Sequence, residues 1–102
     1  MKSKRSKATD IPQSVKKIVW ERDKKRCVVC GSHYAMPNGH YLRRSKGGLG
    51  IPKNIVTLCQ DCHHGFDNGK NAIHYQAIIR DYLRGIYPDW NVNDLVYRKG
   101  EQ

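Results

Sequence analysis

Two Cys-x-x-Cys pairs constrain the fold of this chain more than any other feature of its sequence. The pairs are Cys27/Cys30 and Cys59/Cys62, and no other cysteine is present. In a reducing compartment such spacing indicates a metal site rather than disulfides, because four thiolates close a tetrahedral shell around zinc. We therefore predict a structural zinc ion that clamps the intervening loop at its base and adds on the order of 10 kcal/mol to folding. A redox dithiol and four thiols without a metal are the alternatives.

The chain length allows one domain with a small core. A domain of 102 residues buries only about two-thirds of the surface that its unfolded chain exposes, so a metal staple would help it to fold. Apolar residues make up 38% and charged residues 27% of the composition, which is globular but polar. We expect residues 1–10 to be a basic, disordered tail. Residues 11–102 are expected to form a single domain with a C-terminal helical extension.

The net charge of +10, from 19 basic and 9 acidic residues, favours a polyanionic partner. Each Lys or Arg that meets a phosphate releases condensed counterions, so DNA, RNA and an anionic membrane all fit this charge. No apolar run approaches a membrane span of about 20 residues, and none follows the basic N-terminus as in a secretory signal. We therefore expect an intracellular protein that binds nucleic acid and no membrane. The basic run Met1–Lys7 is either a phosphate-contacting arm or a solvated tail.

Hydrophobic spacing and turn residues predict an α+β domain. Pro12 suits the start of a first helix, and Asp10 and Gln13 can form a capping box there. Gly85 and Pro88 are expected to end the last helix. The expected elements are a helix over about 12–23, two short strands or a hairpin over 33–36 and 39–42, a loop over 46–50, a strand over 55–58, a helical turn or more over 62–67, a helix over about 71–84, and a segment over 86–97 that folds back onto the core.

Side chains suited to phosphodiester hydrolysis lie between the cysteine pairs and just after them. That reaction needs a base to take a proton from water and a cation to stabilise charge on the phosphate and the leaving oxygen. The imidazole of His40 can be the base, since neutral histidine is available at cellular pH. His63 and Asp67 are four residues apart, so on a helix they share one face and can hold one Mg²⁺ or Mn²⁺ ion. Arg43 and Arg44 can contact phosphate oxygens.

The same residues, in this order, carry a resemblance to a known family. The motifs are Cys27-x-x-Cys30, Gly39-His40-Tyr41, Gly47-Gly48 and Asn54-Ile55-Val56-Thr57-Leu58-Cys59-x-x-Cys62-His63-His64. Together they resemble the HNH endonucleases. Tracts in the loop, in the following helix and near the C-terminus are similar to small HNH proteins of bacteriophage and prophage. The resemblance spans about residues 11–97 and implies a small ββα-metal, treble-clef-like domain with a structural four-cysteine zinc site and flanking helices.

The resemblance also implies roles for individual residues. His40 takes the place of the general base, and Asn54 would hold the loop that carries it through a side-chain to backbone hydrogen bond. His63 matches the metal-ligand histidine that begins the helix, and Asp67 stands where many members have a further histidine ligand. Many members also have His or Asp just before the base, where this chain has Gly39. The catalytic cation would then depend on His63, Asp67, water and substrate phosphate.

We therefore predict a divalent-metal-dependent endonuclease that nicks DNA or cleaves both strands. Zn²⁺ would be structural, and Mg²⁺ or Mn²⁺ catalytic. The expected DNA contacts are Arg43, Arg44, Lys46 and His64. The resemblance implies the cytoplasm of a bacterial or phage-infected cell, and a monomer and a homodimer both fit. The alternatives are a non-catalytic, zinc-stabilised module that binds nucleic acid and an adaptor that binds phage DNA-packaging proteins.

Overall fold

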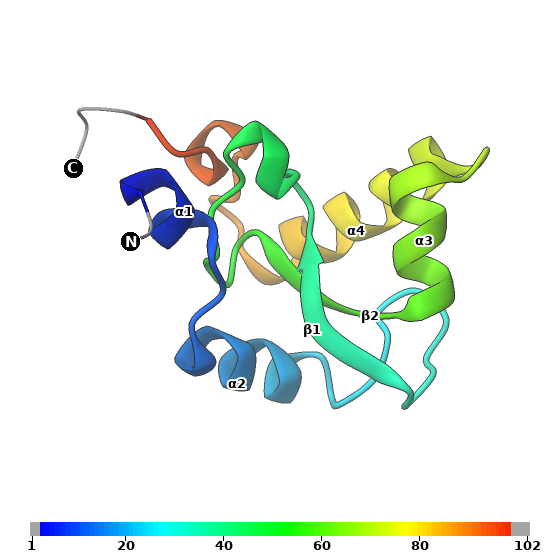
Figure 1. Cartoon of the computed structure of the whole chain (residues 1–102). Coiled ribbons are helices and arrows are strands. Elements are labelled where there is room, and N and C mark those ends of the chain that lie inside the picture. The colour runs from blue at the N-terminus through cyan, green and yellow to red at the C-terminus, as the bar shows by residue number, and fades with distance from the viewer. Residues whose placement is uncertain (1–2, 99–102) are drawn as a thin grey trace.

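The computed structural model describes residues 3–98, in which helices flank a two-stranded sheet (Figure 1). The elements are α1 (Lys4–Thr9), α2 (Gln13–Arg22), β1 (Ala35–His40), the 3-10 helix η1 (Arg44–Lys46), β2 (Ile55–Cys59), α3 (Gln60–Asn68), α4 (Ala72–Ile86) and the 3-10 helix η2 (Val92–Leu95). Helix α2 packs against both strands, whereas α3 follows β2 directly and packs against α4. The chain is thus an α+β domain, as predicted. Among the residues described, no helix has the length and apolar character needed to cross a membrane.

The two strands pair antiparallel, with His40 opposite Ile55. The register shifts between Met36 and Gly39, so residues 37–38 form an irregularity inside one continuous strand. The prediction of two short strands or a hairpin across this turn is therefore wrong. A proline lacks a backbone N–H and is tolerated at a bulge, so the turn residues bend β1 without ending it.

Gly39 allows β1 to approach β2 closely just before His40. A Cβ atom at this position would lie 2.6 Å from Cδ1 of Leu58 and 3.2 Å from the carbonyl oxygen of Val56. A side chain there would displace Leu58 and press on the backbone of β2, since real Cβ contacts are essentially never as short as the first of these. The absence of a side chain before His40 thus has a packing cause in this chain.

Helix α2 agrees with the helix expected over about 12–23, but its N-terminus is capped differently. Pro12 is the N-cap residue, and no side chain caps the helix. The predicted capping box of Asp10 and Gln13 is therefore wrong. The Asp10 carboxylate forms an ion pair with Arg44 instead. A contact between segments far apart in the sequence thus replaces the local one.

Helices α3 and α4 also differ from expectation at their ends. Helix α3 begins at Gln60, before the expected 62–67, because Sγ of Cys59 accepts a hydrogen bond from the backbone N–H of Cys62 and caps it. Helix α4 continues through Gly85, where the sequence predicts its end, and finishes at Ile86. One cysteine thus serves both the metal cluster and the start of the helix that carries His63.

The N-terminal segment differs from the expected disordered tail. Within the described residues, Lys4–Thr9 form α1, and Thr9 is only 2% exposed. Nη2 of Arg5 donates to the carbonyl oxygen of Ser45 at 2.8 Å. Composition alone predicts disorder for such a basic run, but contacts with the loop after β1 fix it. Residues 1 and 2 lie outside the described part of the chain.

The hydrophobic core lies between the sheet, α3 and α4. Its buried members are Cys27, Val56, Leu58, Cys59, Cys62, Phe66, Ile79 and Leu83. The segment after α4 folds back as predicted: Nε1 of Trp90 donates to the carbonyl oxygen of Lys53 at 2.7 Å. Leu95 is fully buried, and Val96 forms an antiparallel bridge with Gly48. The C-terminal segment therefore supports the loop that follows β1.

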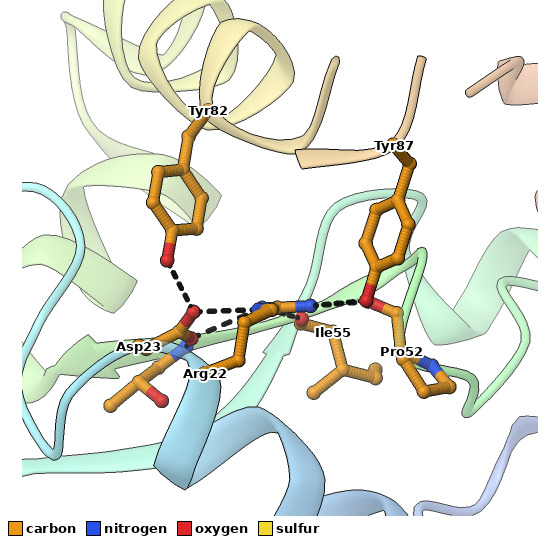
Figure 2. A network of polar contacts seen from close by, with 7 residues as sticks. Arg22, Asp23, Pro52, Ile55, Tyr82 and Tyr87 are labelled. Atoms are coloured by element: carbon orange, nitrogen blue, oxygen red, sulfur yellow. Dashed lines mark hydrogen bonds and ion pairs between the residues drawn. The ribbon is translucent and has the colours of Figure 1, made fainter. Parts of the chain in front are cut away.

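A buried ion pair at the end of α2 joins three parts of the chain (Figure 2). Arg22 donates to both carboxylate oxygens of Asp23, at 2.8 and 3.1 Å, and the Tyr82 hydroxyl donates to Asp23 at 2.6 Å. Arg22 also donates to the carbonyl oxygens of Pro52 and Ile55, each at 2.8 Å. Burial, and then the bond to Asp23, raises the pKa of Tyr82 to about 12. Buried charges need such partners, so the network fixes α2, the start of β2 and α4 relative to one another.

Candidate active site and zinc centre

The four cysteines lie together where the turn after α2 meets the start of α3. Their Sγ atoms are all within 4.8 Å of one another, and those of Cys30 and Cys59 are 3.5 Å apart. Zinc–sulfur bonds of about 2.3 Å place tetrahedral sulfurs roughly 3.8 Å apart, so the four thiols fit a zinc ion. Among the His, Cys, Asp and Glu side chains of residues 3–98, these four cysteines are the one group of three or more that lie close enough to share an ion. The cluster is consistent with the structural zinc site that the spacing predicts.

The electrostatics of the cluster favour a bound cation. Burial raises the pKa of Cys27, but hydrogen bonds from backbone N–H groups, including those of Cys30 and Cys59, outweigh it and lower that pKa to about 7. Burial, and then the neighbouring thiols, raise the pKa of Cys62 above its usual value. Thiolates this close repel one another, so a positive ion is needed for all four to ionise.

His40 ends β1 and is half-buried. Its Nε2 lies 2.9 Å from the carbonyl oxygen of Thr9, within hydrogen-bond distance. Burial lowers the pKa of His40 below its usual value, and the charges of Arg44 and His63 lower it further, against the opposing effect of the Thr9 bond. The ring is therefore held largely neutral at cellular pH, which is the form that accepts a proton.

His63 and Asp67 lie one turn apart on α3, as their spacing predicts. Nδ1 of His63 is 2.9 Å from Oδ2 of Asp67, and the two side chains are 35% and 33% exposed. Nη2 of Arg43 donates to the backbone carbonyl oxygen of Asp67 at 2.7 Å. An imidazole and a carboxylate so placed offer one nitrogen and one oxygen to a hard cation.

One cleft, with a volume of about 910 Å³, brings most of the predicted site residues together. His40, Arg43 and Arg44 come from the end of β1 and the loop after it, and His63 and Asp67 come from α3. The complete lining is Asp10, Ile11, Pro12, Lys16, Asn38, His40, Arg43, Arg44, Ser45, His63, Asp67 and Asn68. The cleft thus combines an imidazole, a pair of potential metal ligands and several cationic side chains, which is chemistry suited to a phosphate.

Asn54 lies beneath the loop after β1 and is fully buried. Its Oδ1 accepts from the backbone N–H of Leu42 at 2.7 Å, and its Nδ2 donates to the carbonyl oxygens of Leu42 and Leu49 at 3.1 and 2.8 Å. The backbone N–H of Tyr41, next to His40, donates to the carbonyl oxygen of Asn54 at 2.8 Å. This residue therefore ties both ends of the loop to the residues that follow His40.

Two of the expected DNA contacts do not line this cleft. Lys46 lines a smaller hollow beside Tyr41 and Phe66. His64 is exposed and lines a second hollow together with Tyr34. Both hollows adjoin the cleft, because Arg43 also lines the hollow of Lys46, and His63 and Asp67 also line the hollow of His64.

The contribution of the N-terminal segment to the cleft has no signal in the sequence. Thr9 contacts His40, and Asp10 and Lys16 line the cleft. Asp10 shows only a helix-capping pattern, and Lys16 falls on the polar face of a predicted helix. Their place in the cleft depends on how α1 and α2 lie against the loop after β1, which no local pattern encodes.

Comparisons with known proteins bear on the fold. No family model matches the chain. The structure of the Type IV phosphorothioation-dependent restriction endonuclease ScoMcrA matches it with a TM-score of 0.64 and 24% identity, over 78% of this chain and 17% of that chain. The chain therefore shares a small, ββα-metal-like fold with part of that endonuclease. The recognition of an HNH-like pattern in the sequence is thereby confirmed at the level of the fold.

A match in sequence is found with anaredoxin from Nostoc sp. (strain PCC 7120 / SAG 25.82 / UTEX 2576). The two are 37% identical over 49 residues, which is 47% of this chain and 64% of anaredoxin. The chain thus spans less than two-thirds of anaredoxin, and the structural match covers a small part of the restriction endonuclease chain. In this fold β1 supplies His40, and α3 supplies His63 and Asp67.

Proposed function

We propose that this HNH-type domain is a divalent-metal-dependent endonuclease that hydrolyses DNA phosphodiester bonds. One observation carries the proposal: a single cleft is lined by the His40 imidazole, the His63/Asp67 pair and the guanidinium groups of Arg43 and Arg44. A module that only binds nucleic acid needs cations, but it needs neither a half-buried histidine nor a nitrogen–oxygen ligand pair beside them.

The donors in the cleft fit a hard cation. His63 and Asp67 would hold Mg²⁺ or Mn²⁺, and Gly39 adds no third side chain. Mg²⁺ usually keeps several waters and takes one or two protein ligands together with substrate phosphate, so this small set is adequate. Such an ion, when bound, stabilises negative charge on the phosphate and the departing oxygen.

His40 is the proposed general base. Its neutral ring accepts a proton from water, and the resulting hydroxide attacks phosphorus in line with the bond that breaks. The bond between phosphorus and the 3′ oxygen breaks, and that oxygen takes a proton from water, which leaves 5′-phosphate and 3′-hydroxyl ends. Asn54 is a positioning residue, because its bonds to Leu42 and Leu49 hold the backbone that follows His40.

Arg43 and Arg44 are the proposed phosphate contacts. Arg44 pairs with Asp10 in the cleft, and Arg43 is exposed and bonded to the end of α3. Guanidinium groups form strong, charge-assisted bonds with phosphate oxygens. The net charge of +10 supports a nucleic-acid substrate, and the likeness to a restriction endonuclease supports DNA.

Cleavage of supercoiled plasmid tests the proposal. The full chain is incubated with plasmid in Mg²⁺, Mn²⁺ or EDTA, and relaxed and linear products are measured. We expect metal-dependent cleavage that His40→Ala reduces by about 10²- to 10⁴-fold while DNA binding is retained. His74→Ala is the matched control, because His74 is exposed on α4 and outside the cleft. Binding without cleavage in any metal would support the non-catalytic adaptor instead.

A further inference from the structure

The N-terminal segment, defined here as residues 3–10, is bonded at several points to the loop over residues 44–50, which borders the cleft. Arg5 donates to the carbonyl oxygen of Ser45 at 2.8 Å, and the backbone N–H of Gly50 donates to the carbonyl oxygen of Ala8 at 3.0 Å. Asp10 forms an ion pair with Arg44. These bonds join the N-terminal segment to both ends of the loop over residues 44–50, and they thus fix the backbone of the segment.

That fixed backbone presents one carbonyl oxygen to His40. The Thr9 carbonyl lies 2.9 Å from Nε2, and Thr9 itself is only 2% exposed. A carbonyl oxygen can only accept, so Nε2 must carry the hydrogen of this bond. A neutral imidazole has a single N–H, and Nδ1 of His40 is then left with the lone pair.

We propose that the N-terminal segment is a positioning part of the catalytic site, in which the Thr9 carbonyl fixes His40 as the Nε2–H tautomer. Nδ1 is then the atom that receives the proton of water, and the imidazolium that forms keeps its Nε2–H bond to Thr9. The catalytic consequence rests on the proposed nuclease function. The tautomer itself does not, because it follows from the resting geometry alone.

The segment has a simpler possible use as an arm that contacts phosphates. Lys4 and Lys7 are exposed on α1 and suit that use. The two uses predict different effects. An arm acts through its charges and changes DNA affinity, whereas a positioning segment acts through its backbone and changes kcat.

Gly50 offers a way to displace the segment in the full chain without altering a cleft residue. A Cβ atom on Gly50 would overlap the backbone carbonyl of Asp10 and approach Cα of Ile11, so Gly50→Ala must force the backbone directly after Thr9 and the loop at Gly50 apart. Thr9→Gly is a second variant, which removes the buried side chain that anchors the carbonyl. Gly85→Ala is the matched control, because a Cβ atom there meets nothing within 4 Å.

The primary measurement is the tautomer of His40, read from ¹⁵N–¹H correlation spectra of histidine-labelled protein. We expect the Nε2–H form in the wild type and in Gly85→Ala, and a mixture of tautomers in Gly50→Ala and Thr9→Gly. Circular dichroism and thermal melting establish that each variant is folded. Nδ1–H as the dominant form in the wild type would overturn the proposal, as would an unchanged tautomer in both folded variants.

Plasmid cleavage supplies the second measurement. Gly50→Ala and Thr9→Gly are expected to lower kcat by about 10- to 100-fold with little change in KM, as misplaced catalytic groups do. The double variant Lys4→Ala/Lys7→Ala is expected to raise KM and leave kcat unaltered. Loss of kcat in the lysine variant, with none in the backbone variants, would overturn the proposal. If the wild type cleaves no DNA, the nuclease proposal fails, while the spectra still decide the tautomer.

Discussion

Nδ1 of His63 lies 2.9 Å from Oδ2 of Asp67, one turn further along α3, and both side chains are about one-third exposed. The pair therefore faces solvent in the cleft, where a cation can reach it. The helix that holds the pair begins at Gln60, directly after Cys59, whose sulfur caps it. The zinc site and the proposed catalytic-metal site are thus connected through the first turn of α3.

Asp67→Asn tests the proposed ligand pair. The amide keeps the size of the side chain but removes its negative charge, so a hard cation is held less tightly. We expect the Mg²⁺ concentration for half-maximal plasmid cleavage to rise by about tenfold or more, in line with the loss when groups around a metal are removed. Asp61→Asn is the matched control, since Asp61 is an exposed acidic residue on the same helix. An equal rise in both variants would assign the effect to general charge.

The pH dependence of cleavage tests His40 as the base. Burial, together with the charges of Arg44 and His63, lowers its pKa below the ordinary histidine value of 6.5, against the opposing effect of the Thr9 carbonyl. The neutral ring is the active form, so kcat/KM should rise with pH and reach half its plateau below pH 6.5. The same midpoint should appear when His40 is titrated by NMR. A midpoint above 6.5 would contradict this assignment.

Asn54→Ala tests the support beneath the loop that follows His40. The change leaves half-buried backbone groups of Leu42 and Leu49 without their partners, which costs up to about 1–3 kcal/mol for each group that water does not reach. We expect a lower urea midpoint and a lower kcat. Asn71→Ala is the control, because Asn71 is exposed and its side chain makes no capping bond. Unchanged stability in Asn54→Ala would show that the loop after β1 does not need the Asn54 side chain for its stability.

Much of the fold can be predicted because its signals are local. The cysteine spacing predicts the cluster, and the separation of His63 and Asp67 predicts their shared face on α3. Apolar spacing predicts helix α4, but the helix runs past the expected residue 84 and ends at Ile86. Local patterns fix which residues are helical more firmly than they fix where a helix ends.

The parts that cannot be predicted depend on contacts between distant segments. Arg22 follows the spacing of the apolar residues in α2, and only the structure shows it bonded to Asp23 and to the carbonyl oxygens of Pro52 and Ile55. The bond from His40 to Thr9 likewise joins residues 31 positions apart. No periodicity or turn signal reports such pairs, because each partner is locally an ordinary polar residue.

Zinc removal tests the role of the cysteine cluster. Cys59→Ser weakens a zinc ligand and also removes the sulfur that caps α3, so we expect the domain to unfold. Metal analysis of the wild type should find zinc, and a strong chelator should abolish the folded circular dichroism signal. Added zinc should then restore that signal, which separates metal loss from irreversible damage. A folded, zinc-free Cys59→Ser protein would contradict the proposed structural role.

The salt dependence of DNA binding tests the basic cleft. Each phosphate contact contributes about 0.9 to the slope of log K against log salt concentration, so a cleft residue that meets phosphate has a measurable share of that slope. Binding is measured with His40→Ala protein, which leaves the DNA intact. We expect Arg43→Ala to reduce the slope by about 0.9, whereas Arg84→Ala, which removes an exposed charge on α4 outside the cleft, should change it little. Equal effects of the two variants would mean that DNA is held by the overall charge of +10 and that the cleft has no special part in binding.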